Sequence, residues 1–140
     1  MEHYLFLSST DSLTYYPENT PEYFTVNLEQ SLCLRGSWKI ALTDINIELN
    51  FNSPRRPSHL ELMVNICQPS FIYGKYLQTV RRLYIPPKTQ SLYEVFPSPY
   101  YFNLKEAEFR SVTVNVLDQN LQASKLTGEI NFTLHLKRVS

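Results

Sequence analysis

The side chains that could carry out chemistry are dispersed along the sequence rather than grouped in motifs. The three histidines, His3, His59 and His135, lie in separate segments, whereas a zinc site needs clustered ligands at short spacings. The sequence contains neither a GxSxG nucleophile elbow nor a nucleotide-binding loop. A general acid–base pair built from distant carboxylates stays open as an alternative, although no motif requires one. We therefore predict a protein that is not an enzyme and uses no metal or cofactor.

The two cysteines, Cys33 and Cys67, are far apart and lie outside any CxxC motif. Each has apolar neighbours, which favours two buried, reduced thiols over a disulfide. The first ten residues, MEHYLFLSST, lack the long apolar run of a signal peptide or of a membrane span. The sequence thus predicts a soluble chain that is made in the cytoplasm and has no membrane span.

Paired cations and surplus aromatic residues are the features best suited to binding. Basic pairs occur at 55–56, 81–82 and 137–138, and ten Tyr, eight Phe and one Trp are many for 140 residues. Together with Tyr73, Tyr76 and Tyr84, these pairs could line a groove for single-stranded nucleic acid. The alternatives are solvated strand ends or a protein–protein interface, where Arg and Tyr are enriched. Because 13 basic and 13 acidic side chains leave no net charge, nucleic acid is the disfavoured partner.

A protein–protein interface would explain both the arginine pairs and the aromatic excess. The candidate interface residues are Tyr15, Tyr16, Arg55, Arg56, Phe71, Tyr73, Tyr76, Arg81 and Arg82. The first choices are the loops at 52–58 and 71–76. Prolines stiffen the first loop and adjacent aromatics fill the second, so ordering them on binding should cost little entropy.

Alternation of apolar and polar residues dominates the chain and predicts β-strands. The clearest segments are residues 24–29, 38–49, 60–67, 112–116 and 130–137, and weaker ones cover 4–7, 76–82, 92–96 and 100–104. A one-residue shift of the pattern near Asp44 predicts a β-bulge. Each strong segment has one apolar and one polar face, as antiparallel sheets require. We predict one all-β domain over residues 1–140, an antiparallel β-sandwich of about eight strands, most simply a single jelly roll.

The apolar phase of the strongest strands predicts the core. Trp38, Leu42, Val114, Phe132 and Leu134 should meet inside one sandwich. His135 lies on the polar phase of the last strand, so we expect its ring to be solvated.

The segment YYPENTP at residues 15–21 predicts a stiff entrance to the first strong strand. Pro17 and Pro21 each fix a φ angle and cannot donate to a sheet, and Glu18 and Asn19 suit the turn between them. Tyr15 and Tyr16, which precede this turn, could lay their rings over a sheet edge. Further along, Gly36 permits a left-handed turn into the strand that begins at Trp38.

The first third of the chain resembles a motif of virion proteins from adomaviruses, adintoviruses and Polinton-like elements. In that motif a Y-[YF]-P-[DE]-N-T segment precedes F-x-x-x-L and an L-x-L-x-G-x-W run. The matching positions here include Tyr15, Tyr16, Pro17, Glu18, Asn19, Thr20, Phe24, Leu28, Leu32, Leu34, Gly36 and Trp38. The last quarter, ending in Leu134, Leu136, Lys137 and Arg138, is similar to the final two strands of such single jelly rolls.

This resemblance implies a structural subunit of the virion, of the penton or minor capsid kind, without catalytic residues. It implies a homo-oligomer, a trimer or pentamer, that contacts other capsid proteins and is made in the host cytoplasm, with assembly there or in the nucleus. One alternative is a spike head that binds a host receptor or glycan through Tyr-rich loops at 71–73 and 100–102. A second alternative is a barrel that binds single-stranded nucleic acid.

Overall fold

The computed structural model describes residues 2–11, 13, 15–72 and 74–139, and in these residues all regular structure is β. The strands are β1 (Glu2–Ser8), β2 (Tyr23–Cys33), β3 (Trp38–Glu48), β4 (His59–Val64), β5 (Ser70–Ile72), β6 (Lys75–Leu77), β7 (Thr79–Tyr84), β8 (Ser91–Val95), β9 (Phe102–Asn103), β10 (Glu108–Asp118) and β11 (Ile130–Arg138).

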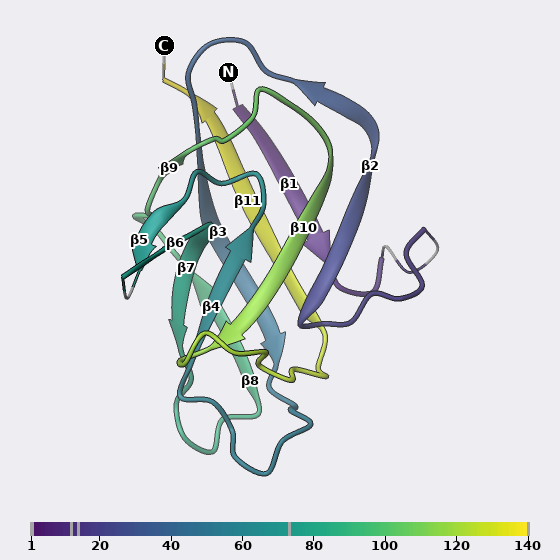
Figure 1. Ribbon diagram of the computed structural model, residues 1–140, viewed down its shortest axis with the longest axis vertical. Helices are drawn as coiled ribbons and strands as arrows, with labels where there is room; N and C mark the ends of the chain where they lie inside the picture. The colour runs from purple at the N-terminus through teal and green to yellow at the C-terminus, as the bar shows by residue number, and fades with distance from the viewer. Residues whose placement is uncertain (1, 12, 14, 73, 140) are drawn as a thin grey trace.

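Two antiparallel sheets pack face to face (Figure 1). The first sheet has the order β1-β11-β3-β8, with β9 pairing with the start of β3, and the second has the order β2-β10-β4-β7. Apart from β9 and the β5–β6 hairpin, eight strands of the described chain build these sheets, and successive strands alternate between them except for β4 and β7, which are neighbours in the second sheet. This order is that of a single jelly roll, so the predicted fold class is confirmed.

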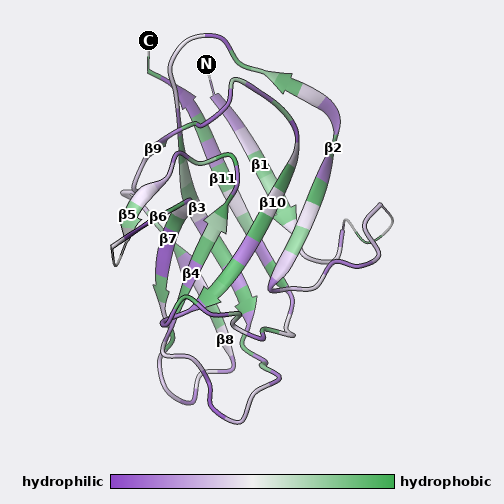
Figure 2. Ribbon diagram, viewed as in Figure 1, coloured by the Kyte–Doolittle hydropathy of each residue, from purple (hydrophilic) through white to green (hydrophobic). Residues whose placement is uncertain are grey.

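The core lies between the sheets and follows from the alternation of the sequence. Hydrophobic and hydrophilic residues alternate along the strands (Figure 2), which turns one face of each sheet inward and the other outward. All five residues predicted for the core, Trp38, Leu42, Val114, Phe132 and Leu134, are buried and belong to one hydrophobic cluster. Phe24 is fully buried, and its ring centroid lies 6.4 Å from that of Phe132 on the opposite sheet.

The bulge predicted near Asp44 is present in β3. Asp44 pairs with Thr133 of β11, whereas Leu42 pairs with Leu134, so Thr43 is the extra residue. The insertion lets both Leu42 and Ile45 point inward although they are three positions apart. The shift in the apolar pattern was therefore a correct indicator of the bulge.

The weaker strand predictions were less accurate. The predicted strand at 76–82 is divided between β6, which pairs with β5 in a separate hairpin, and β7, which belongs to the second sheet. Only Phe102 and Asn103 of the predicted strand at 100–104 pair as β9. The surroundings change within these short segments, since Tyr76 is exposed whereas Val80 belongs to the main core, so alternation alone did not locate their ends.

The prediction that both thiols are buried holds for Cys67 only. Cys67 is fully buried, and its Sγ lies 3.9 Å from the carbonyl oxygen of Thr79. Cys33, by contrast, is exposed at the end of β2. Both cysteines are free. Alternation explains the error, because the apolar neighbours Leu32 and Leu34 face the opposite way from the residue between them.

The two thiols are expected to react with alkylating agents at very different rates. Burial raises the pKa of Cys67 to about 12, so roughly one molecule in ten thousand carries a thiolate there at pH 8. Iodoacetamide at that pH should modify Cys33 in the folded protein and Cys67 only after unfolding, as read by intact mass and peptide mapping. Equal rates at both positions, or an unlabelled protein two protons lighter, would contradict this assignment.

Candidate assembly surface

The β5–β6 hairpin presents an aromatic pair to solvent. Phe71 and Tyr76 are directly opposite each other in the hairpin, and their ring centroids lie 5.1 Å apart in an edge-on arrangement. Phe71 is 64% exposed and Tyr76 is 75% exposed. Tyr73, the third aromatic residue predicted for this surface, lies outside the described residues. Exposed aromatics on a paired, two-stranded frame are suited to a contact with another protein.

The loop at 52–58 reaches the same region of the molecule as this hairpin. One hollow is bordered by Arg55, Arg56 and the turn at 119–120, and a neighbouring hollow is bordered by the same turn, His59 and Lys75. The Nη2 of Arg56 donates to the carbonyl oxygen of Pro86 at 2.8 Å, which anchors the loop, while Arg55 is exposed. The two loops predicted as first choices for an interface thus flank one continuous surface.

The second arginine pair has structural contacts inside the subunit. The guanidinium of Arg81 lies between the rings of Phe96 and Tyr100, 4.0 and 4.1 Å from their centroids. Arg82 forms a short ion pair through its Nε with the fully buried Glu61 on the adjacent strand. Arg81 therefore contributes to internal packing, and part of the Arg82 side chain is used to compensate a buried carboxylate.

The segment at 15–21 closes the edge of β2 as a brace. The side-chain amide of Asn19 donates to the carbonyl oxygen of Thr25 at 2.8 Å and accepts from its N–H at 3.1 Å. The Asn19 side chain thus makes the two backbone hydrogen bonds that a neighbouring strand would otherwise make with Thr25. Tyr15 is 69% exposed and Tyr16 is half-buried, so the Tyr15 ring does not cover the sheet edge as expected from the sequence.

The other motif residues lie in the turn of the brace, in the core and in the turn before β3. Pro17 and Glu18 form the turn of the brace, and Phe24 is buried in the core at the start of β2. Gly36 has a φ of 91°, the left-handed conformation expected of it. The indole N–H of Trp38 donates to the carbonyl oxygen of Arg35 at 2.7 Å, which ties this turn to the strand that follows.

The brace and the hairpin lie on opposite flanks of the sandwich. In Figure 1 the segment that contains Tyr15 and Tyr16 extends on the side of β2, whereas β5 and β6 lie on the side of β7. The nine candidate interface residues are therefore not one patch. Those that the structure describes divide into a brace flank, a hairpin flank that includes the 52–58 loop, and the Arg81–Arg82 pair, in which Arg81 is half-buried and Arg82 is exposed.

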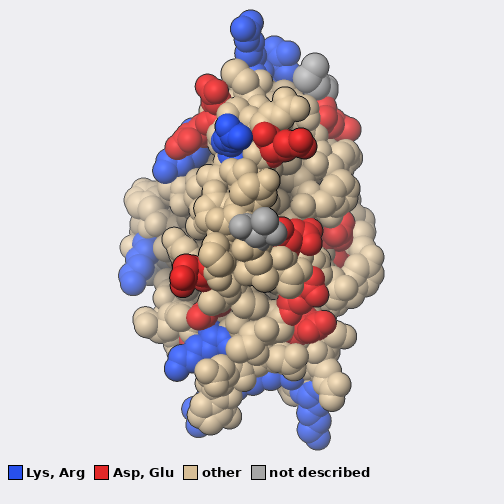
Figure 3. Space-filling view, turned by 90° about the vertical axis from the view of Figure 1, so that its right-hand side faces the viewer, with Lys and Arg blue, Asp and Glu red and all other residues tan. Residues whose placement is uncertain are grey.

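The basic pairs do not assemble into a nucleic-acid groove. Lys137 and Arg138 lie at the end of the molecule where the chain terminates, whereas Arg55 and Arg56 lie in the loops at the other end (Figure 1). On the face seen from the β2 side, acidic side chains are mixed with basic ones (Figure 3). A continuous positive track, which binding of single strands requires, is not formed by these residues.

A polar cluster around His135 was missed by the sequence analysis. His135 is only 6% exposed, and its Nδ1 lies 2.7 Å from the hydroxyl of Tyr101. The ring of Tyr4 stacks on the imidazole with centroids 4.6 Å apart. Burial, and to a smaller extent Tyr4 and Glu2, raises the pKa of Tyr101. The expectation of a solvated His135 is therefore wrong, because side chains from β1 and the segment before β9 cover the outward face of β11.

Neither a metal centre nor a membrane-spanning helix was found in the part of the chain that the structure describes. No group of three or more His, Cys, Asp or Glu side chains among these residues could hold a metal ion. None of these residues forms a helix of the length and apolarity that crossing a membrane takes.

The order of the strands in the two sheets defines the fold as a jelly roll, an architecture shared by viral capsid domains, lectin domains and cupins. The chain is similar in structure to a selenomethionine-labelled mavirus penton protein, with a TM-score of 0.69 and 6% sequence identity. The likeness covers 99% of this chain and 100% of that chain. No protein-family model and no curated protein sequence matches the chain.

Proposed function

We propose that this chain is a structural subunit of a virus particle that associates with further copies of itself and with other capsid proteins. The end-to-end likeness to the mavirus penton protein carries the proposal. The motif at 15–20, with Gly36 and Trp38, supports a relationship to virion proteins of adomaviruses, adintoviruses and Polinton-like elements. On this proposal the protein resides in the virion after synthesis in the host cytoplasm, with assembly there or in the nucleus.

The role in this proposal is non-enzymatic, since the polar groups with the most contacts act structurally. Glu61 is neutralised by Arg82, Arg81 is held between two aromatic rings, and His135 is bonded to Tyr101. The Tyr-rich loop at 100–102, proposed from the sequence as a receptor contact, is also engaged internally through Tyr100 and Tyr101. Tyr100 is still 63% exposed, so one side of this loop is accessible to a partner.

The two flanks are suited to a ring of subunits. In a trimer or pentamer with cyclic symmetry, each subunit uses one surface toward one neighbour and a different surface toward the other. The hairpin flank, with Phe71 and Tyr76, and the brace flank, with Tyr15, could supply these two surfaces. Two interfaces of about 800 Å² each would cover about a fifth of the 8087 Å² surface of one subunit.

The unaltered protein is expected to form a trimer or pentamer at micromolar concentration, as measured by native mass spectrometry. The double variant Phe71→Ala/Tyr76→Ala and the variant Tyr15→Ala should each be mainly monomeric, because each loses exposed aromatic anchors on one flank. The matched control is Tyr93→Ala, which removes a 69% exposed aromatic on β8 in the first sheet and should leave the oligomer unchanged.

Mixing the two flank variants tests whether the contact joins unlike surfaces. Each variant keeps the flank that the other has lost, so together they should form a one-to-one heterodimer and nothing larger. An interface built from two copies of one flank would give a homodimer of the variant that retains that flank. A strictly monomeric unaltered protein, or flank variants with the parental mass, would refute the assembly proposal and leave the fold standing.

A further inference from the structure

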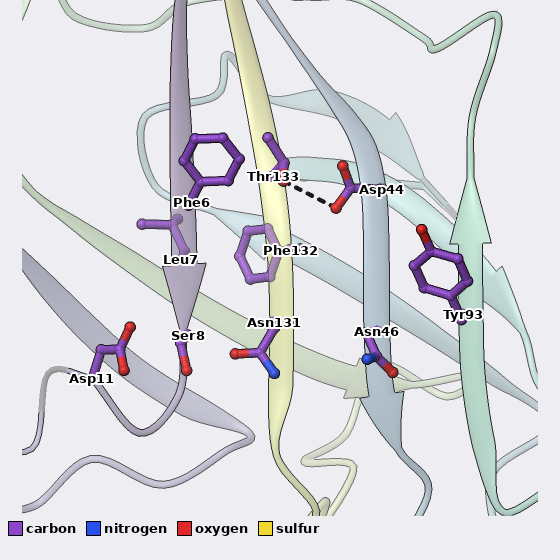
Figure 4. A pocket seen from close by; sticks show the side chains of 10 residues that line it. All are labelled: Phe6, Leu7, Ser8, Asp11, Asp44, Asn46, Tyr93, Asn131, Phe132 and Thr133. Carbon is purple, nitrogen blue, oxygen red and sulfur yellow. Dashed lines mark hydrogen bonds between the residues drawn. The ribbon is translucent and has the colours of Figure 1, made fainter.

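The outward face of the first sheet carries an open groove. Figure 4 shows that β1, β11, β3 and β8 contribute side chains to it in turn. The groove has a volume of about 410 Å³, within the range of pockets that bind small molecules. No sequence motif indicated it, because its residues come from four strands that are distant in the chain.

Two exposed aromatic rings border the groove on opposite sides. Phe6 on β1 is 77% exposed and Tyr93 on β8 is 69% exposed, which are high values for rings on a sheet. Since β11 and β3 lie between these strands, three strand spacings, or about 14 Å, separate the two sides. The rings thus stand far enough apart for an extended ligand to lie between them.

Polar side chains form the floor between the rings. Asn131 and Asn46 are paired neighbours on β11 and β3, and Asn46 is in turn paired with Tyr93. Neither asparagine has a side-chain hydrogen bond to any described residue, so both amides are available to a ligand. Asp44 accepts from the hydroxyl of Thr133 at 2.9 Å, which fixes the orientation of its carboxylate beside the amides.

The charge of the groove restricts the class of ligand. Asp44 and Asp11 are its ionisable groups, and none of the described residues that line it is Lys or Arg. An anionic ligand would meet these carboxylates without a compensating cation. Amides and a carboxylate can instead donate to and accept from hydroxyl groups, while the aromatic rings can contact an apolar face.

We propose that this groove binds a neutral oligosaccharide. The apolar faces of its sugar rings would stack on Phe6 and Tyr93, and its hydroxyls would bond Asn46, Asn131 and Asp44. This activity goes beyond subunit assembly and uses a site different from the Tyr-rich loops suggested by the sequence. A second protein subunit fits the groove less well, because a dry contact would bury two amides that have no intramolecular partners.

The test is binding of uncharged tetrasaccharides, with chitotetraose, cellotetraose and lacto-N-neotetraose as the probes. Saturation-transfer NMR on the unaltered protein should detect contact with at least one of them, and titration should give its Kd. Phe6→Ala and Tyr93→Ala should each weaken this binding at least tenfold, and Asn131→Ala should do so through loss of hydrogen bonds. Tyr84→Ala, on the other sheet, is the matched aromatic control and should bind as the unaltered protein does.

Several outcomes would overturn the proposal. These are no saturation transfer from any of the three probes, equal binding by Phe6→Ala and Tyr93→Ala, or tighter binding of sialylated lacto-N-neotetraose than of its neutral parent. Native mass spectrometry of the same variants separates this site from assembly. If Phe6→Ala or Tyr93→Ala dissociates the oligomer, the face is a subunit contact and the glycan proposal fails.

Discussion

Replacing Phe132 with alanine is expected to lower the free energy of unfolding by about 3–5 kcal/mol. Phe132 is 3% exposed near the start of β11 and meets Phe24 from the other sheet, so the change removes a ring at the junction of the two layers. The surrounding strands are paired on both sides and cannot easily close the cavity. Urea denaturation followed by Trp38 fluorescence measures the loss.

Phe6→Ala is the control for this prediction. Phe6 occupies β1, beside the residue that pairs with Phe132, but it is 77% exposed. Its removal should cost less than about 1 kcal/mol, because little apolar surface is buried there. A loss below about 1 kcal/mol for Phe132→Ala would show that the two sheets do not pack through this ring.

Replacing Gly128 with alanine is expected to cost at least about 3 kcal/mol, the upper end of overpacking effects in protein cores. A Cβ at this position would overlap the carbonyl group of Glu48, at the end of β3. That carbonyl belongs to backbone fixed by nearby pairing, since the N–H of Glu48 donates to the carbonyl oxygen of Glu129 at 2.9 Å. The overlap can be relieved only by moving the 127–129 segment away from the end of β3.

Gly74→Ala provides a contrasting glycine for the same denaturation measurement. Gly74 has a φ of 76° in the exposed hairpin, but a Cβ there would contact nothing within 4 Å. The cost should be about 1 kcal/mol, from backbone strain alone. If Gly128→Ala proved no more damaging than Gly74→Ala, the close approach of the 127–129 segment to Glu48 would be refuted.

The sequence allowed the sandwich to be predicted because its long strands are amphipathic on their own. In β10, Val112, Val114 and Val116 define an apolar face without reference to any other segment. The bulge in β3 was predictable for the same reason, since a break in alternation near Asp44 is a local signal. These features depend on residues two positions apart. Such residues lie on the same face of a strand, whichever strand it pairs with.

The errors concern residues whose surroundings come from distant parts of the chain. His135 is on a polar phase, and only the arrival of Tyr101 and Tyr4 from other segments makes it buried. The apolar residues on either side of Cys33 in the sequence point the opposite way from it. Their presence therefore did not indicate that Cys33 is buried. The β5–β6 hairpin packs beside the sandwich rather than within it, which weakens the pattern that defines its ends.

The candidate site was only partly predictable. The type of a residue indicates which contacts it can make, but not which partner it contacts. Arginine beside aromatic residues suggested an external contact at Arg81, but the rings of Phe96 and Tyr100 are the partners. Phe71 and Tyr76 are exposed, as an interface would need, but their role as partner contacts stays a prediction. The groove between Phe6 and Tyr93 required knowledge of the strand order.

The position of β11 between β1 and β3 has a consequence for the folding of the chain during synthesis. β1 and β3 both pair with residues 130–138. They cannot join one sheet until those residues have left the ribosome. The first sheet is therefore incomplete until β11 has been synthesised, and the inward faces of β1 and β3 lack their shared neighbour before then. Folding that depends on such distant pairing is slow, and nascent chains with open strand edges are prone to aggregation. We expect chaperones that bind extended apolar segments to act on this protein until its last strand is released.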